Sequence, residues 1–314
     1  VYSIDIMPPE IDENRRHHII GAQANVWTEY MTGEKHVEYM VFPRLAALAE
    51  ALWTPGEKLD FEGFSRRMTA QYARYDAADL NYRVPHPQGY EAISLVTDET
   101  VSAELTNGIP GSAIYFTTDG SDPDLRSERY SGPIILEPDN EITLKSVTVM
   151  PGGRMSAVMT GIFRRAEMKK AACPENLNPG LAFSLYRGEF STVKEIAGEA
   201  DSAGLVSTVR IPAGSPAENF GLVLKGYIVV PADGIYTFYT GSDDGVMLVI
   251  DDELIVDGDV LHHGITNKGQ TALRAGYHAI KVLYFQRLYR QSLSLSWEGP
   301  GVSRQTVPPE VLFQ

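Results

Sequence analysis

Hydrophobic positions in the N-terminal part of the chain follow the period of an α-helix. Along residues 37–52, apolar side chains recur at steps of three and four, which predicts an amphipathic helix. These positions are Val37, Val41, Leu45, Leu48 and Leu52. Because proline has no amide hydrogen to donate, Pro43 predicts a kink or a helix restart within this run. A second apolar stripe predicts another helix, with Phe61, Phe64, Met68, Tyr72 and Tyr75 on one face. The apolar run 19–27 before them predicts a buried strand.

The rest of the chain alternates apolar and polar positions, which is the period of a β-strand. Past the proline-rich segment 83–87, alternation at 113–117 and 142–149 predicts strands of a small antiparallel sandwich, separated by turns rich in Gly, Asp and Pro. Alternation at 222–230 and 277–285 predicts the strands of a second sandwich. We therefore expect a multidomain chain in which a helical N-terminal part precedes two all-β domains.

The composition narrows the classes of partner. The chain has 314 residues, of which 43% are hydrophobic and 22% charged, as is typical of globular proteins. A formal net charge of −14 argues against a nucleic-acid partner, because such binding needs a basic surface. No apolar run is long enough to span a membrane. Cys173 is the only cysteine, so neither an intrachain disulfide nor a four-cysteine zinc site is expected.

A tryptophan and a carboxylate stand two positions apart where the predicted strand 19–27 ends. Trp27 and Glu29 would share a face if the strand continued, and residues at the C-terminal ends of barrel strands face the active site. An indole packs against the C–H face of a pyranose, while a carboxylate accepts hydrogen bonds from its hydroxyls. By pattern alone, a core tryptophan and a glutamate at a helix start explain the pair more simply.

A resemblance to a known protein family favours the sugar-binding interpretation of Trp27 and Glu29 over the structural one. Gly21–Tyr30, with the sequence Gly-Ala-Gln-Ala-Asn-Val-Trp-Thr-Glu-Tyr, resembles the last barrel strand of glycoside hydrolase family 20. Val37–Glu50, followed by Trp53, resembles that family's terminal barrel helix. The resemblance implies that the chain opens with the C-terminal fragment of a (β/α)8 TIM barrel. It also implies that Trp27 lines the pocket for a non-reducing N-acetylhexosamine and that Glu29 accepts hydrogen bonds from the outer hydroxyls of that sugar.

The family's chemistry is substrate-assisted and relies on an adjacent Asp-Glu pair that follows His-x-Gly-Gly on an earlier strand. The glutamate protonates the leaving oxygen, and the aspartate orients the acetamide whose oxygen attacks the anomeric carbon. Three Asp-Glu pairs occur in this chain, and none follows that motif: Asp12-Glu13, Asp98-Glu99 and Asp252-Glu253. Since a complete barrel takes about 250 residues, residues 1–80 hold only its last one or two units. We expect no catalytic residue in this chain, a truncated start at Val1, and the rest of the barrel as a missing partner.

Two further resemblances cover the β-rich regions. The middle region resembles the C-terminal sandwich domain of chitobiase and β-hexosaminidase, through Ile114–Pro123 and the later Gly132-Pro133-Ile134. The third region resembles the protective-antigen-type β-sandwich, through Pro231–Phe238 and Ser242–Asp251. We expect the barrel end at 1–84, the middle sandwich at 85–166 and the last sandwich at 167–314.

Asp243 and Asp244 are the candidate metal ligands. In sugar-binding members of the protective-antigen type, an adjacent Asp pair on a loop binds calcium, which holds glycan hydroxyls. Calcium prefers six to eight oxygen ligands, and Asn267, Asp257 and Asp259 are further candidates by composition. An ordinary turn before Gly245 is the simpler interpretation. The adjacent histidines 17–18 and 262–263 predict no metal site, because neighbouring side chains on a strand point to opposite faces.

These observations predict part of a β-N-acetylhexosaminidase acting on terminal N-acetylhexosamine in glycans, with no cofactor required for catalysis. The alternative is a non-catalytic carbohydrate-binding or adhesive module, and a third interpretation treats both sandwiches as spacers. The segment from Trp27 to Glu29 separates these interpretations, because an adhesin needs no barrel strand. The family implies a secreted, periplasmic or cell-surface protein.

Overall fold

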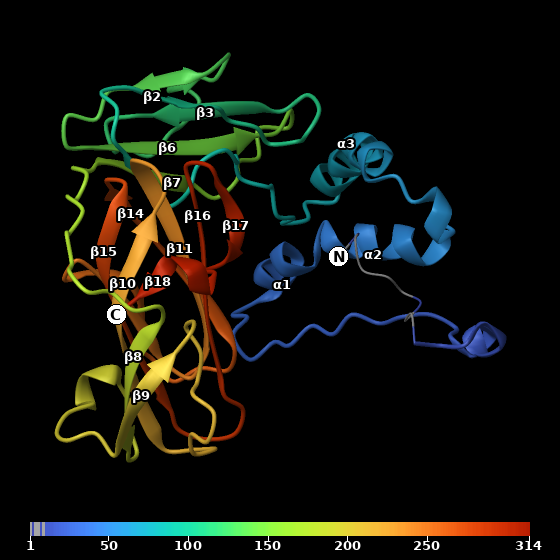
Figure 1. The fold of residues 1–314 in the computed structure, drawn as a ribbon. Helices are drawn as coiled ribbons and strands as arrows, with labels where there is room; N and C mark the ends of the chain where they lie inside the picture. Colours follow the sequence, from blue (N-terminus) through green and yellow to red (C-terminus); the bar gives the residue numbers. More distant parts are fainter. Residues whose placement is uncertain (1, 3–6, 8–9) are drawn as a thin grey trace. The chain divides into compact units, whose positions relative to one another are not determined.

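The computed structural model of the protein describes Tyr2, Met7 and residues 10–314. Of the family-like start Val1–Asp5, only Tyr2 is described, so the rest of that resemblance lies outside the described residues. Backbone contacts divide the chain into two compact units. One comprises 1–93, 100–137 and 141–162, and the other comprises 94–99, 138–140 and 163–314. Helices occupy the blue N-terminal part of the ribbon, and strands occupy the green to red parts (Figure 1).

The helical predictions are confirmed. The helices are η1 (Glu13–His18), α1 (Glu34–Val41), α2 (Arg44–Trp53), η2 (Gly56–Lys58) and α3 (Phe61–Ala77). Pro43 separates α1 from α2, as expected for a residue that cannot continue the hydrogen-bond ladder. No described helix is both long enough and apolar enough to cross a bilayer.

The predicted buried strand at 19–27 is wrong. This segment has no strand structure, and its side chains are exposed, Ile20 by 99% and Trp27 by 71%. A barrel strand is held by hydrogen bonds to strands on both sides and by helices that cover it. The described residues of this unit offer the segment no such neighbours, so its apolar pattern alone does not produce a strand.

The helices are stabilised by one aromatic cluster within the first unit. Helix α3 buries Phe64, Met68, Tyr72 and Tyr75. They pack with Ala47 of α2 and with three residues that follow the helices, namely Tyr82, Val84 and Met150. Burial raises the pKa of Tyr72 to about 12, so this hydroxyl stays protonated at neutral pH. The predicted stripe is thus the buried face of α3 except at Phe61, whose side chain is exposed.

The middle region forms a small β-domain. Its strands are β1 (Ile93–Val96), β2 (Val101–Ala103), β3 (Ala113–Thr117), β4 (Glu128–Arg129), β5 (Ile134–Leu136), β6 (Glu141–Val149) and β7 (Met159–Arg165). They pair in the order β1-β7-β6-β3-β4, with β2 and β5 in a separate two-stranded sheet. Alternate residues of β3 and β6, such as Ile114, Phe116 and Leu144, are buried. The predicted strands at 113–117 and 142–149 are confirmed.

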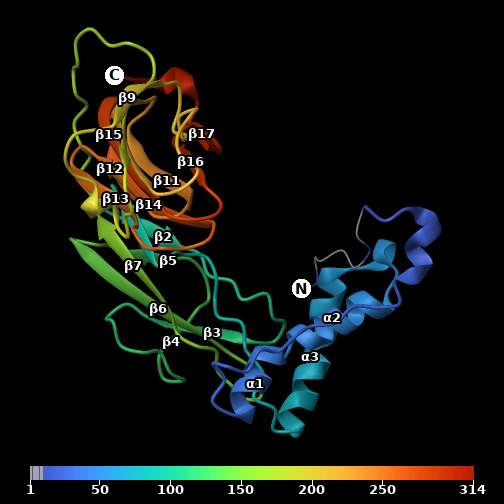
Figure 2. The same ribbon diagram turned by 90° about the horizontal axis from the view of Figure 1, so that it is seen from below.

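The C-terminal region is a larger two-sheet sandwich. Its strands are β8 (Leu181–Arg187), β9 (Ser202–Val206), β10 (Phe220–Val230), β11 (Gly234–Asp243), β12 (Val246–Ile250), β13 (Glu253–Gly258), β14 (Ile265–Leu273), β15 (Gly276–Gln286), β16 (Ser292–Gly299), β17 (Val302–Thr306) and β18 (Leu312–Phe313), with η3 (Val193–Glu195) and η4 (Pro309–Val311). One sheet has the order β13-β12-β15-β10-β8-β9 with β18 on β10, and the other has the order β14-β11-β16-β17. In Figure 2, β12 and β15 lie on one side of this sandwich and β16 and β17 on the other. Its core includes Phe238, Tyr236 and Trp297 from the smaller sheet. The predicted strands at 222–230 and 277–285 are confirmed.

Strand register brings three connections to one end of this sandwich. Each connection crosses between the two sheets: 244–245 joins β11 to β12, 259–264 joins β13 to β14, and 287–291 joins β15 to β16. Val246 at the start of β12 lies opposite Gly258 and Tyr284, while Ser242 near the end of β11 lies opposite Ile265. Asp243 itself lies opposite Ser292. Antiparallel pairing therefore places these three loops together, although they are far apart in the sequence.

A buried histidine stabilises the opposite end of the same sheet. His278 on β15 is fully buried, with Nδ1 2.6 Å from Asp251 Oδ2 and Nε2 2.8 Å from the carbonyl oxygen of Arg274. Removing the ring leaves both oxygens without this partner. We expect His278→Ala to lower the free energy of unfolding by about 2–3 kcal/mol. Urea and thermal unfolding of the 314-residue chain measure this. The exposed His263→Ala serves as a control, and equal stability of the two variants would contradict a structural role for His278.

Candidate functional site

The segment that carries Trp27 and Glu29 is exposed and borders an apolar groove. Both side chains are exposed, so Trp27 is not part of a core in this chain. The groove, of about 460 Å³, is lined by residues 24–27 and by apolar side chains of α1 and α2, including Met40, Leu45 and Leu48. The structure places Trp27 beside an open apolar surface, and the lining of the groove among the described residues includes no carboxylate.

Asp243 and Asp244 lie at the end of β11, where the chain crosses to the other sheet. Both are almost completely buried, with 6% and 4% of their surfaces exposed, and the peptide bond between them is cis. Asp244 Oδ2 accepts a hydrogen bond of 2.9 Å from the backbone N–H of Arg287. Asp243 Oδ1 has no hydrogen-bond partner. A buried carboxylate without compensation is costly, and a bound cation is one means of compensation.

A network of buried hydrogen bonds holds the loop 287–291 beside the Asp pair. The hydroxyl of Tyr284 lies 2.5 Å from the backbone oxygen of Asp243 and 2.7 Å from Gln286 Oε1. Gln286 Nε2 donates in turn to the carbonyl oxygens of Leu288 and Arg290. Burial, together with the negative charges of Asp244 and Asp243, raises the pKa of Tyr284, so its hydroxyl remains a donor. These contacts fix the loop next to the carboxylates.

Further buried oxygen atoms, on β11 and at Asn219, lack hydrogen-bond partners. The buried hydroxyls of Thr240 and Ser242 have no hydrogen-bond partner, and neither does Asn219 Oδ1. Asn219 reaches this region because its N–H donates to the carbonyl oxygen of Arg287, the residue that binds Asp244. No group of three His, Cys, Asp or Glu side chains able to hold a metal occurs among the residues described. A cation here would use two carboxylates plus amide, backbone and water oxygens, a donor set that suits calcium.

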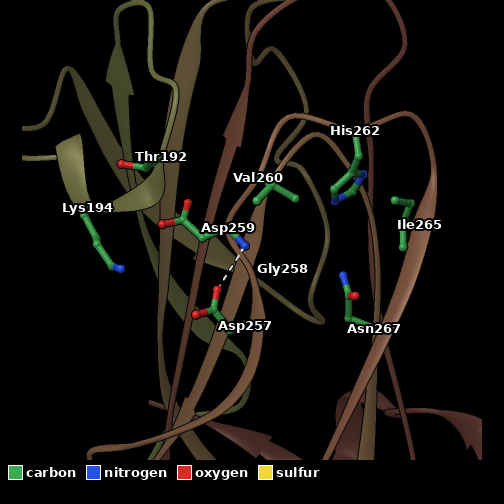
Figure 3. A pocket seen from close by; sticks show the side chains of 9 residues that line it. All are labelled: Thr192, Lys194, Asp257, Gly258, Asp259, Val260, His262, Ile265 and Asn267. Atoms are coloured by element: carbon green, nitrogen blue, oxygen red, sulfur yellow. Dashed lines mark hydrogen bonds between the residues drawn. The ribbon is translucent and has the colours of Figure 1, made fainter.

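The further calcium ligands that composition suggested lie in a different cavity from the Asp pair. Asp257, Asp259 and Asn267 line a cavity of about 520 Å³ whose described lining includes neither Asp243 nor Asp244 (Figure 3). Asp257 Oδ1 accepts a hydrogen bond of 3.1 Å from the N–H of Asp259. Asp259 Oδ1 accepts one of 2.5 Å from the N–H of Val193. Asp257 thus stabilises its own turn, and Asp259 links the loop 259–264 to η3.

Sequence reasoning overlooked Asn219, Tyr284 and Gln286. Arg287 and Asp244 are separated by 43 positions, and only the pairing of β11, β12, β15 and β16 brings them together. One local signal existed, because Asn219 adopts a positive φ of 58°, a conformation that asparagine tolerates better than most residues. Nothing in the sequence connects that turn to the Asp pair.

Three family models match different parts of the chain. Residues 1–56 match the family model described as the catalytic domain of glycosyl hydrolase family 20, 103–163 match the model described as Fn3 associated, and 177–310 match the PA14 domain. The resemblance of the middle region to the chitobiase C-terminal sandwich stays a prediction.

Similar proteins include a beta-hexosaminidase of Porphyromonas gingivalis, which is 29% identical over 304 residues, covering 90% of this chain and 37% of that protein. A beta-N-acetylhexosaminidase of Cellulomonas fimi is 41% identical over 69 residues, covering 22% of this chain and 12% of that protein. The chain thus spans little more than a third of the first relative and less of the second. Among solved structures, the PA14 domain of the MpAFP antifreeze protein is 16% identical and covers 46% of this chain and 96% of its own, with a TM-score of 0.40.

Proposed function

We propose that this chain, which carries the end of a glycoside hydrolase family 20 catalytic domain and a PA14 domain, is the C-terminal part of a β-N-acetylhexosaminidase. The proposed reaction removes terminal non-reducing N-acetyl-β-hexosamine residues from glycans by the substrate-assisted, retaining route. The observation that carries the proposal is similarity to a beta-hexosaminidase along 90% of the chain, through the helical part and the β-domains alike. The matching stretch is too long to reflect one shared accessory domain.

The apolar groove beside Trp27 supports the idea that residues 1–84 are the end of a TIM barrel. Trp27, Met40 and Leu45 are exposed by 71%, 40% and 46%. Exposed apolar side chains around a groove indicate a surface that another part of a protein covers. We propose that the preceding strands and helices of the barrel cover it and, by pairing with residues 19–27, convert that segment into a strand.

Within the complete barrel, Trp27 and Glu29 would bind the sugar and leave the bond-breaking chemistry to other residues. The indole face of Trp27 would pack on the C–H face of the terminal sugar, excluding water from one side of the pocket. Glu29 would accept hydrogen bonds from the outer hydroxyls and so orient the ring. The Asp-Glu pair would belong to the part of the enzyme outside this chain.

The experiment for this proposal is an assay of the enzyme extended upstream until the barrel is complete. Release of 4-nitrophenol from 4-nitrophenyl N-acetyl-β-D-glucosaminide and from the galactosaminide would support it and establish the sugar preference. Failure to hydrolyse either substrate by a folded, complete barrel would contradict it.

We further propose that the PA14 domain is a calcium-dependent glycan-binding module and that the protein acts outside the cytoplasm or on the cell surface. The specific observation in favour is the buried pair Asp243 and Asp244, one oxygen of which has no partner. Asn219 and the fastened loop 287–291 supply further oxygens around it. Calcium bound there would present its open coordination positions to sugar hydroxyls.

We expect calcium to raise the thermal stability of the 314-residue chain. A ligand that binds only the folded state at a hundred times its Kd stabilises by about 2.7 kcal/mol. The double variant Asp243→Asn with Asp244→Asn should lose this response. Asp257→Asn, which changes a carboxylate in another cavity, should keep it. Thermal scanning with calcium and with EDTA measures the effect, and an identical melting temperature in both for the wild-type chain would favour the turn interpretation.

A further inference from the structure

We propose that the cavity between the loop 259–264 and the segment around η3 is a second saccharide-binding site that needs no cation. The proposal rests on the proposed glycan-binding function of the PA14 domain and adds a site with its own residues. It would bind one neutral sugar unit through its hydroxyls. The cavity has a volume of about 520 Å³, enough for a sugar ring with its first shell of contacts.

The walls of the cavity combine polar groups with a small apolar surface. Figure 3 shows His262 and Asn267 pointing toward one another from opposite sides of the opening, near the side chains of Val260 and Ile265. Those two aliphatic side chains are 59% and 43% exposed. Sugar rings present C–H groups beside hydroxyls, so a wall with both kinds of surface matches them.

His262 has hydrogen-bonding capacity that the protein does not use. Neither of its ring nitrogens has a partner in the described structure, although both are shielded from solvent. A neutral imidazole offers one donor and one acceptor, and a hydroxyl group can satisfy either. Because no hydrogen bond holds the ring, it can turn and present these atoms to a ligand. Buried polar atoms without hydrogen-bond partners are uncommon. A ligand that supplies these partners explains why the two unpaired nitrogens are tolerated.

The remaining polar groups are positioned by the backbone. A Cβ atom added at Gly258 would lie 2.5 Å from Asn267 Nδ2, so the amide lies directly against this glycine. Asp257 and Asp259 each use one carboxylate oxygen in a hydrogen bond to a backbone N–H. Lys194 contributes a positive charge to the same cavity. The mixture of one cation with two carboxylates disfavours a strongly charged ligand and favours a neutral one.

This cavity lies at the same end of the sandwich as the Asp pair. Ile265, which lines it, pairs with Ser242, the residue before Asp243. Gly258, another lining residue, pairs with Val246, two positions after Asp244. One glycan chain could therefore contact both sites, which would raise its apparent affinity through the high effective concentration of the second unit.

The test is calorimetric titration of the 314-residue chain with triacetylchitotriose, in calcium and in excess EDTA. We expect binding in EDTA to persist in the Asp243→Asn, Asp244→Asn double variant. It should weaken about tenfold or more in His262→Ala combined with Asn267→Ala, because two hydrogen bonds are lost. His263→Ala, which changes the adjacent exposed histidine, is the matched control and should bind normally. Gly258→Ala, which displaces the Asn267 amide, gives a second, independent variant, and unfolding scans identify any variant that fails to fold.

The outcomes separate the two sites. Absence of binding in EDTA by the wild-type chain would overturn this proposal and leave calcium-dependent binding intact. Binding in EDTA that is unchanged both in His262→Ala combined with Asn267→Ala and in Gly258→Ala would also overturn it, because the sugar would lie elsewhere. If calcium changes neither the stability nor the binding of the wild-type chain, while binding in EDTA is present and weakens in the His262→Ala, Asn267→Ala variant, the Asp243–Asp244 site is rejected and this one is supported. No binding under either condition would reject both.

Discussion

The purified 314-residue chain is expected to release no 4-nitrophenol from 4-nitrophenyl N-acetyl-β-D-glucosaminide above the uncatalysed rate. None of its three Asp-Glu pairs follows His-x-Gly-Gly, and Asp252, for example, lies in the turn between β12 and β13. A positioned proton donor by itself contributes about 10²–10⁴-fold to such a rate. We expect the aspartate that orients the acetamide to be lacking as well, in which case the full deficit would exceed this figure.

The assay requires a matched positive control. The upstream-extended enzyme, purified in the same way, should hydrolyse the substrate, and its variant without the acid of the Asp-Glu pair should not. Addition of N-acetylglucosamine as a competitor distinguishes site-specific hydrolysis from a contaminant. Turnover by the 314-residue chain at a rate within a hundredfold of the extended enzyme would show that its own residues supply the acid, contrary to the proposal.

The second large effect concerns Trp27 and Glu29 in the extended enzyme. Glu29→Gln keeps the shape of the side chain but removes its charge, and the loss of a charged hydrogen bond to a sugar hydroxyl costs about 1.5–3 kcal/mol. We therefore expect kcat/KM to fall roughly ten- to a hundredfold, and a comparable fall for Trp27→Ala through the lost stacking surface. Initial rates over a range of substrate concentrations measure both.

Two control variants distinguish a loss of sugar binding from a loss of protein stability. Glu34→Gln changes an exposed carboxylate in the first turn of α1 and should leave kcat/KM unchanged. Trp27→Phe keeps an aromatic face and should recover part of the activity lost in Trp27→Ala. Near-normal kcat/KM in Trp27→Ala and Glu29→Gln would assign both residues a structural role. A large fall in melting temperature for Trp27→Ala alone would favour the core-tryptophan interpretation within the complete barrel.

Local patterns in the sequence were sufficient to predict helices and strands whose formation depends mainly on the residues within the segment. The stripe from Phe64 to Tyr75 predicted the buried face of α3, since helical hydrogen bonds form within the segment. Pro43 predicted the break between α1 and α2 for the same reason. Alternation along 142–149 predicted the strand β6, although its residues 146–149 are buried on both faces. The Asp243-Asp244 pair was also visible as a candidate site before its surroundings were known.

Features that depend on distant partners required the tertiary structure. The run 19–27 has the composition of a buried strand but forms none, because strand hydrogen bonds join separate segments and the described residues of its unit supply none to it. The burial of Asp244 and its bond to Arg287 follow from the register of β11, β12, β15 and β16, which no local pattern encodes. The ring nitrogens of His262 are shielded from solvent although the residue lies in a connection between two strands, and no local pattern predicts that burial. The sequence by itself thus determined most helices and strands and the resemblance to glycoside hydrolase family 20, whereas side-chain sites built from several strands were decided by how those strands pair.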